Sequence, residues 1–288
     1  MTSRALLFAV GLALAGCGSD EGEAPAPVVI DRSPLGDDRP VEPFIPASYD
    51  GSPIPLVILL HGYGATGEVN DWIFGLSEVF EEERFILLRP DGTRNDDGRR
   101  FWNATDACCA FDADAPDDVA YLAGLIEEAR ARYDIARVAV VGHSNGGFMA
   151  HRFACDRAEL VDAIGSLAGV TFADPAACQP SEPVAVLQMH GVDDDTVLYE
   201  GGEDLGGMPA VYPSAEETVA TWAALDGCAT SPSPGGAADY SDFAEGDETT
   251  VHQAPDCPVV LWEMAGVEHV PGLNQTWRDD LLRFLLDR

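Results

Sequence analysis

The chain has 288 residues, of which 46% are hydrophobic and 8% aromatic, and it carries a formal net charge of −34. This composition is that of a globular protein and excludes a largely disordered chain. A protein this acidic repels nucleic acid and anionic membrane surfaces, so we expect neither as a partner. The acidity is typical of a soluble exported protein; adaptation to salt, or a preference for neutral or cationic substrates, is the alternative.

The first element in chain order is an export signal. Arg4 precedes an unbroken apolar run, Ala5 to Ala15, which is too short to span a bilayer. The run ends in Leu14-Ala15-Gly16-Cys17. This pattern resembles the bacterial lipobox, whose cysteine is lipidated and becomes the first mature residue. A general signal peptide that happens to contain a cysteine is the alternative.

This signal divides the chain into three parts. We expect a lipoprotein signal peptide over 1–16, the lipidated Cys17 and a flexible linker over 17–27, and a catalytic domain over 28–288. The linker is small, acidic and contains proline, a composition typical of a disordered tether. The protein is therefore predicted to be exported, as a cell-envelope lipoprotein on the periplasmic or outer side, or as an extracellular protein. The lipid anchor is the only membrane contact expected.

The sequence contains seven cysteines, and six remain when Cys17 is set aside: Cys108, Cys109, Cys155, Cys178, Cys228 and Cys257. An even number in an exported protein indicates disulfides, although many pairings are possible. Cys155–Cys178 would close a local loop between a helix and a strand, and Cys228–Cys257 would flank a hairpin. Cys108 and Cys109 are then joined to each other or free. No CxxC spacing occurs, so no metal site is expected.

Strand-like and helix-like segments alternate along the rest of the chain. The predicted strands cover 55–60, 85–88, 137–141, 162–167, 184–189 and 259–264. The predicted helices cover 71–82, 117–133, 144–155, 214–225 and 277–286, the fourth opening with a Ser214–Glu217 capping box. This alternation predicts a single α/β domain with a doubly wound, mostly parallel sheet flanked by helices. In such a sheet the loops at the carboxyl ends of the strands carry the chemistry.

The strongest local motif follows the strand that ends at Val141. It reads Gly142-His143-Ser144-Asn145-Gly146, a G-x-S-x-G sequence between a strand and a helix. A serine on such a sharp turn needs small neighbours, and the helix start behind it favours negative charge. Ser144 is therefore predicted to be a catalytic nucleophile. A structural turn rich in glycine is the alternative.

A second motif, His61-Gly62-Tyr63-Gly64, directly follows the buried strand 55–60. Acyl-transfer enzymes with a G-x-S-x-G elbow take one oxyanion donor from the residue after the nucleophile and another from a loop after an early strand. Asn145 N–H fits the first role, and Tyr63 N–H, or alternatively Gly62 N–H, fits the second. A tight turn without such a role is the alternative.

The catalytic acid and histidine should follow the serine in chain order. His269 lies in the loop between the last strand and the last helix, which makes it the candidate among six histidines. The acid should follow strand 184–189, where Asp193, Asp194 and Asp195 are adjacent. A calcium loop or a solvated turn is the alternative reading of these three aspartates.

Taken together, the motifs resemble secreted polyhydroxybutyrate-depolymerase-like and feruloyl- or acetylxylan-type esterases of the α/β-hydrolase superfamily. The matching residues span about 50–285 and comprise His61–Gly64, Pro90-Asp91-Gly92, Trp102, Cys108-Cys109, Asp117-Asp118-Val119, Gly142–Gly147, Cys155, Cys178, His190-Gly191-x-x-Asp194-x-x-Val197, Gly227-Cys228, Cys257 and Gly266-x-x-His269-x-x-Gly272. The resemblance implies an α/β-hydrolase fold and selects Asp194 as the acid. Leu198 and Val270 depart from the family, which often has Pro and Trp at these positions; without this Trp the feruloyl assignment is weaker.

The sequence thus predicts a monomeric serine esterase with the triad Ser144, Asp194 and His269 and without a cofactor. Its substrate would be a small ester, a polyester oligomer or an acylated polysaccharide. Trp102 and His61 are candidates for the substrate pocket, although Trp102 could equally be a core aromatic that pins its loop. The alternatives are a serine peptidase or acyltransferase on the same fold, and a non-catalytic lipoprotein that binds a ligand.

Overall fold

The computed structural model describes residues 29–109, 115–205 and 208–286. The predicted signal peptide, Cys17 and the linker over 17–27 lie outside the described residues. Within the described ranges, no helix combines the length and the apolar character needed to cross a membrane.

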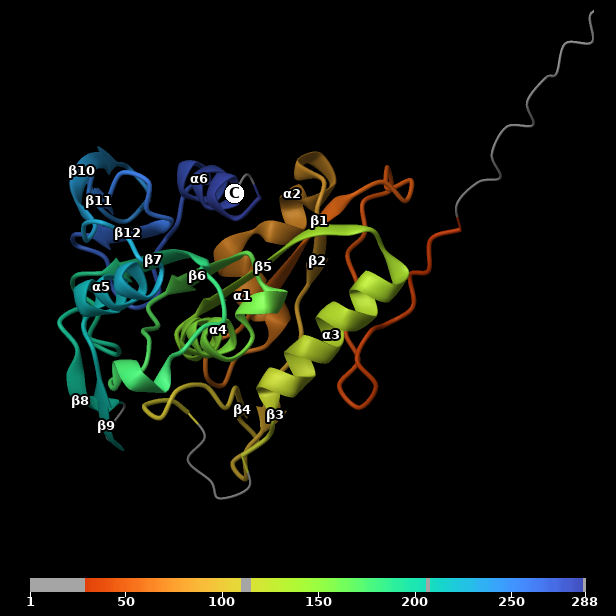
Figure 1. The fold of residues 1–288 in the computed structure, drawn as a ribbon, viewed down its shortest axis with the longest axis horizontal. Helices are drawn as coiled ribbons and strands as arrows, with labels where there is room; N and C mark the ends of the chain where they lie inside the picture. Colours follow the sequence, from red (N-terminus) through yellow and green to blue (C-terminus); the bar gives the residue numbers. More distant parts are fainter. Residues whose placement is uncertain (1–28, 110–114, 206–207, 287–288) are drawn as a thin grey trace, which may run out of the picture.

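The centre of the fold is an eight-stranded sheet with the order β10-β11-β12-β7-β6-β5-β1-β2 (Figure 1). Its strands are β1 (Ile54–Leu60), β2 (Ile86–Leu88), β5 (Ile135–His143), β6 (Ala163–Leu167), β7 (Ala185–Gly191), β10 (Ser233–Ala238), β11 (Thr249–Gln253) and β12 (Val259–Met264). The run from β2 to β12 is parallel, and β11 and β10 add to it antiparallel. The predicted doubly wound, mostly parallel sheet is therefore confirmed. Two small hairpins lie outside it, β3 (Thr93–Arg94) with β4 (Arg100–Phe101) and β8 (Gly202–Leu205) with β9 (Met208–Tyr212).

Helices cover both faces of this sheet (Figure 1). They are α1 (Gly67–Phe74), α2 (Leu76–Glu83), α3 (Asp118–Arg132), α4 (Asn145–Asp156), α5 (Ala215–Leu225) and α6 (Gln275–Leu286). Side chains alternate along a strand, so Leu56 and Ile58 of β1 join the core under α3, α4 and α5, while Val57 and Leu59 join the core under α1, α2 and α6. Two apolar cores therefore sandwich the sheet.

Local signals in the sequence predicted where most helices and strands begin or end. Ser214 and Glu217 form the predicted capping box of α5, and Asp117 caps α3 through the N–H of Ala120. The single helix predicted over 71–82 is wrong, because Gly75 adopts a left-handed backbone (φ 64°) that ends α1 and starts α2.

Disulfides join Cys155–Cys178 and Cys228–Cys257, as expected from the sequence. Cys108 and Cys109, which the sequence left either joined or free, are joined to each other. The Cys228–Cys257 pair encloses the β10–β11 hairpin, as predicted. At the opposite edge of the sheet, Phe44 pairs with Leu87 of β2 through two backbone hydrogen bonds of 3.0 Å. The segment before β1 thus covers part of that edge.

Helix α4 packs closely on the end of β1 because glycines line the contact. A Cβ atom on Gly146 would collide with the backbone carbonyl of Leu60, and one on Gly142 would collide with the carbonyl group of Gly146. Both collisions are with main chain, which cannot rotate away as a side chain can. The glycines of the predicted elbow are therefore required by packing.

This contact generates a prediction for Gly146→Ala. We expect it to lower the free energy of unfolding by about 1–3 kcal/mol, because the added methyl group must displace the backbone. The matched control is Gly124→Ala on α3, where a Cβ meets no atom within 4 Å. The control should gain about 0.5–1 kcal/mol from the better helix propensity of alanine. Urea unfolding of both variants measures the difference, and equal stabilities would contradict the packing argument.

His151 of α4 is fully buried between the sheet and α5. The indole Nε1–H of Trp222 donates to its Nδ1 at 2.9 Å, and its Nε2–H donates to Oε1 of Gln188 at 2.9 Å. Burial lowers the pKa of His151 to about 4. The imidazole is therefore neutral in the folded protein at neutral pH.

A neutral buried histidine makes folding sensitive to acid. Below pH 6.5 the unfolded chain binds a proton at His151 that the folded chain does not bind until about pH 4, so the free energy of unfolding falls as the pH drops through this window. We expect a loss of about 3 kcal/mol from this residue. Urea unfolding of wild type and His151→Gln at a series of pH values tests this, since the variant should show a flatter dependence between these limits. An equally steep dependence in both proteins would exclude His151 as the cause.

Candidate active site

The sheet topology brings two of the predicted loops together. From β1 the chain moves to β2 on one side and then returns to β5 on the other side of β1. The order of strands reverses at this point, and ligands of open α/β sheets bind at the carboxyl ends of the strands there. The loop that begins at His61 follows β1, and Ser144 follows β5.

Ser144 occupies a strained turn between β5 and α4. Its backbone is left-handed (φ 55°, ψ −121°), and its N–H donates to the carbonyl of Leu167 at 2.7 Å. A non-glycine residue in this conformation costs about 1–3 kcal/mol, which the surrounding packing must offset. The side chain is half-buried, and it lies at the N-terminal end of α4, where the helix dipole favours negative charge.

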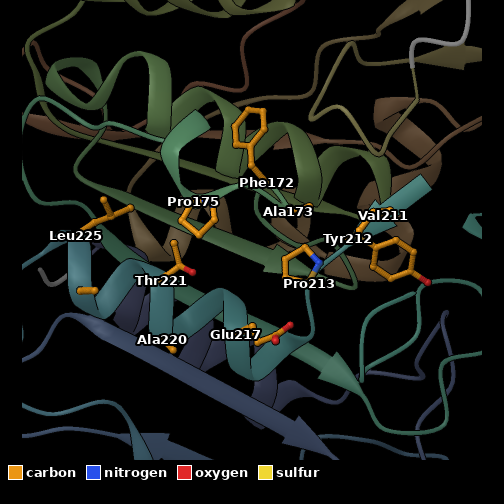
Figure 2. Close-up of a pocket in the computed structure, with 11 residues that line it drawn as sticks. Phe172, Ala173, Pro175, Val211, Tyr212, Pro213, Glu217, Ala220, Thr221 and Leu225 are labelled. Carbon is orange, nitrogen blue, oxygen red and sulfur yellow. The ribbon is translucent and has the colours of Figure 1, made fainter. Parts of the chain in front are cut away.

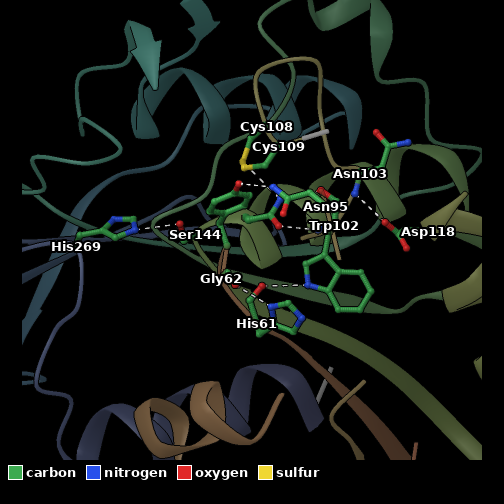
Figure 3. Close-up of a disulfide and its surroundings, with 12 residues drawn as sticks. His61, Gly62, Asn95, Trp102, Asn103, Cys108, Cys109, Asp118, Ser144 and His269 are labelled. Atoms are coloured by element: carbon green, nitrogen blue, oxygen red, sulfur yellow. Dashed lines mark hydrogen bonds between the residues drawn. A yellow bond between two sulfur atoms is a disulfide. The ribbon is translucent and has the colours of Figure 1, made fainter. Parts of the chain in front are cut away.

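The three residues predicted as a triad lie in hydrogen-bond contact. Ser144 Oγ lies 3.0 Å from Nε2 of His269 (Figure 3), and Nδ1 of His269 lies 2.7 Å from Oδ2 of Asp194. An ionised carboxylate only accepts, so Nδ1 carries the proton and Nε2 accepts from the serine hydroxyl. The residues follow β5, β12 and β7, so three parallel strands deliver them to one edge of the sheet.

Among the three adjacent aspartates only Asp194 faces His269. Its side chain has no exposed surface, whereas Asp193 and Asp195 are exposed. Oδ1 of Asp194 accepts the backbone N–H groups of Thr196 at 2.8 Å and Val197 at 2.9 Å. Burial by itself would raise the pKa of Asp194, but hydrogen bonds from histidine side chains and from the backbone outweigh it and hold this pKa well below its ordinary value. Asp194 is therefore ionised at neutral pH.

The two residues predicted as oxyanion donors lie on segments next to Ser144. Asn145 is the first residue of α4, so its backbone N–H has no partner within the helix. Its buried side chain accepts from the N–H of Trp102 at 2.7 Å and donates to the carbonyl of the same residue at 2.9 Å. Tyr63 lies in the loop after β1; its phenol oxygen accepts from Asn95 at 2.8 Å. A Cβ on Gly62 would lie 3.4 Å from Cβ of Ser144, so this loop passes beside the serine.

Trp102 and His61 do not have the exposed surface that a pocket wall requires. Both are fully buried, with 0% of their surface accessible. The indole of Trp102 donates to the carbonyl of His61 at 3.0 Å (Figure 3), and Nε2 of His61 accepts the N–H of Gly92 at 2.9 Å. The structure favours the alternative for Trp102, a core aromatic that pins its loop, and places His61 beneath the same loop.

Two histidines beside the triad were not assigned a role from the sequence. Nε2 of His143 donates to the backbone carbonyl of His269 at 2.8 Å, and the two rings lie 4.9 Å apart. Burial lowers the pKa of His143 to about 4, so this ring is neutral. Nε2 of His190 lies 3.5 Å from Oδ2 of Asp194. The contact of His143 joins residues 126 positions apart, which no local pattern reveals.

A cavity of about 660 Å³ lies on the α5 side of the molecule, apart from these residues (Figure 2). Its walls include Phe172, Tyr212 and Pro213 and one side of α5, and none of the triad residues lines it.

The sequence matches proteins that are named as esterases. It is 27% identical to feruloyl esterase B of Piromyces equi over 184 residues, which cover 61% of this chain and 33% of that protein. It is 29% identical to the putative esterase NocK of Nocardia uniformis subsp. tsuyamanensis over 174 residues, 60% of this chain and 48% of that protein. A match to the probable feruloyl esterase C of Aspergillus niger covers 57% of that protein. The aligned segments therefore span between one third and somewhat more than half of the length of these curated relatives.

Solved structures and a family model agree on the fold. The acetyl xylan esterase from Aspergillus awamori superposes with a TM-score of 0.59 at 16% identity, over 89% of this chain and 98% of that one. Esterase PE8 superposes with a TM-score of 0.53 at 19% identity, over 88% of this chain and 99% of that one. At such identities the similarity shows the fold alone. The family model described as the alpha/beta hydrolase fold matches residues 55–199, just over half of the chain. Together with the elbow geometry and the sheet order, this match shows that the chain belongs to the α/β hydrolase family.

Proposed function

We propose that the protein is a serine esterase that hydrolyses carboxylic esters through an acyl-enzyme. The observation that carries this proposal is the line of two hydrogen bonds, 3.0 Å and 2.7 Å long, that joins Ser144 to Asp194 through His269. A serine in this arrangement has a base in contact with its hydroxyl, and the base has a buried anion that orients it. The esterase names of the relatives support the same reaction class.

Acylation begins with attack of Ser144 Oγ on the ester carbonyl carbon. Nε2 of His269 takes the hydroxyl proton as the new C–O bond forms, and the imidazolium is stabilised by the ionised Asp194. The tetrahedral intermediate then collapses, and Nε2 returns the proton to the departing alcohol. The acyl group remains on Ser144 as an ester.

The negative oxygen of the tetrahedral intermediate needs donors close to the serine. We assign this role to the backbone N–H groups of Tyr63 and Asn145, because their loops flank Ser144 at the N-terminal end of α4. A donor of this kind stabilises the transition state by about 3 kcal/mol. The side chain of Asn145 bonds to the main chain of Trp102, and the indole of Trp102 donates to the carbonyl of His61, so Trp102 links the start of α4 to the loop that carries Tyr63.

Deacylation repeats the same steps with water as the nucleophile. Nε2 of His269 removes a proton from the water as its oxygen attacks the acyl carbon. Nε2 then returns this proton to Ser144 Oγ as the bond to the serine breaks and the acid leaves. The side chains of the triad supply every proton transfer, so the proposed reaction uses no metal or organic cofactor.

We propose acylated polysaccharides, polyester oligomers or smaller carboxylic esters as substrates. Val270 and Leu198, which replace the Trp and Pro frequent in the related esterases, are 57% and 44% exposed. They follow His269 and Val197, so both apolar side chains lie on loops of the triad. Aliphatic groups at these positions favour aliphatic acyl or alcohol groups over aromatic ones that would stack on a Trp.

We propose that the enzyme acts outside the cytoplasm, anchored by a lipid on Cys17. Three disulfides in the described domain support export, because such bonds persist in oxidising compartments. The lipobox-like sequence before Cys17 supports the anchor. Partitioning of wild type and Cys17→Ser between detergent and water tests it, and equal partitioning of the two would refute the anchor.

The central prediction concerns Ser144→Ala. We expect ester hydrolysis to fall by at least about 10⁴-fold with unchanged folding, because the nucleophile is lost while the fold remains. The measurement is turnover of p-nitrophenyl esters of increasing chain length, methyl ferulate and a hydroxybutyrate oligomer, together with fluorophosphonate labelling. Ser181→Ala, at an exposed serine, is the matched control and should label as wild type does.

Three outcomes would contradict the proposal. Labelling that survives Ser144→Ala would assign the nucleophile elsewhere. Absence of labelling in the wild type would indicate a ligand-binding protein on this fold. Cleavage of peptide amides, or acyl transfer to an alcohol in preference to water, would point to a peptidase or an acyltransferase with the same triad.

A further inference from the structure

Asp194 has a second histidine partner besides His269. Nε2 of His190 lies 3.5 Å from Oδ2 of Asp194 and 2.8 Å from the carbonyl oxygen of Val197. The N–H of Val197 in turn donates to Oδ1 of Asp194 at 2.9 Å. His190 therefore contacts both ends of the short turn that carries the carboxylate.

The proton of His190 is directed to this turn by a chain of buried hydrogen bonds. An indole N–H only donates, so Nδ1 of His151 must accept from Trp222 and its Nε2–H must donate to Oε1 of Gln188. The amide nitrogen of Gln188 then faces Nδ1 of His190 at 3.3 Å. His190 consequently keeps its single proton on Nε2, where it points to Val197 and Asp194.

This series of hydrogen-bonded side chains, from Trp222 to His190, is shielded from water along its length. Residues His151, Gln188, His190 and Trp222 have 0% of their surface exposed, and Asp194 has 3%, none of it on the side chain. Water therefore cannot take the place of a lost donor, and its acceptor would stay buried without a partner, which is unfavourable. The hydrogen-bonded side chains come from α4, β7 and α5, so they connect the turn after β7 to two helices.

We infer that His190 is a positioning residue for the acid of the triad: its Nε2–H holds the Asp194–Val197 turn so that Oδ2 of Asp194 meets Nδ1 of His269. This inference rests on the proposed function, in which Asp194 orients the base. His190, which lies at the end of β7, would thus serve the triad as well as the sheet. The contact with substrate remains with Ser144 and His269.

Other ionisable groups lie near His190 and His269 and also contribute to the pH dependence of kcat. Glu263 of β12 lies opposite His190 in the strand register, and the ring of Tyr199 lies edge-on to His190 at 5.8 Å. On the other side, His143 packs against His269.

Two matched variants test the role of His190. The amide nitrogen of His190→Gln reaches about as far as Nε2 of the imidazole and can still donate to the turn. His190→Asn keeps a polar amide near Gln188 but is too short to reach Asp194. We expect the Asn variant to lose roughly 10- to 100-fold in kcat with little change in KM, and the Gln variant to recover most of this loss.

A structural role alone would not change two further properties of the Asn variant. The downfield proton resonance of the His269–Asp194 hydrogen bond should broaden or move upfield, and the acid limb of the kcat profile should move to lower pH because the imidazolium is less stabilised. Thermal unfolding checks that both variants fold. Equal kcat, resonance and pH profile in wild type and a folded Asn variant would overturn the inference.

A measurement on the wild type separates this inference from the proposed function. Long-range ¹⁵N–¹H correlation spectra of wild type report which nitrogen of His190 carries the proton, without any turnover. We expect a neutral ring with the proton on Nε2. A proton on Nδ1, or on both nitrogens at neutral pH, would overturn the positioning role even if the protein is an esterase. Conversely, a wild type that neither labels nor hydrolyses esters would refute the proposed function while this spectrum remained informative.

Discussion

The left-handed turn at Ser144 depends on the close contact between helix α4 and the end of strand β1. Because Gly142 and Gly146 have no side chains, the helix can start directly behind the strand. A Cβ atom at either position would collide with main-chain atoms. Helix α4 is buried along nearly its whole length, from Asn145 to Cys155. The apolar packing of this helix offsets the strain of one unfavourable backbone conformation. In this way a requirement of the core fixes the position of the serine hydroxyl.

Several histidine side chains are buried in the same core in their neutral form. His61, His143 and His151 are all buried, and burial lowers the pKa of each. Each ring has hydrogen-bond partners, so these histidines act as neutral connectors within the fold. Asp194 is different, because two histidine side chains and two backbone N–H groups surround its carboxylate. A buried carboxylate with four donors therefore lies directly beside His269.

Local sequence predicted much of the fold because the decisive signals were short. Strand 259–264 has the bounds predicted from its apolar run, and Ser214 with Glu217 marked the start of α5. The elbow was visible because glycine spacing and the flanking strand are contiguous in the chain. Gly75 was missed as a break, since a glycine within a helical pattern does not reveal a left-handed backbone.

Burial and long-range contacts were less accessible to prediction. An exposed or a buried Trp102 fits its local sequence equally well, and its burial follows from bonds to His61 and Asn145, 41 and 43 positions away. The contact of His143 with the carbonyl of His269, 126 positions away, depends in the same way on the order of strands in the sheet. The partners of His190 lie within seven positions of it, but the sequence does not show that its ring turns toward them.

The two edges of the sheet have a further consequence for how copies of the protein meet. An open edge strand is a template for another strand, and such pairing leads to aggregation. Strand β10 contains Pro234, Gly235 and Gly236, which make a poor template, and the backbone of Phe44 already occupies part of the β2 edge. Both edges are therefore unsuited to adding a foreign strand. The net charge of −34 adds repulsion between copies, which opposes the same edge-to-edge pairing of strands.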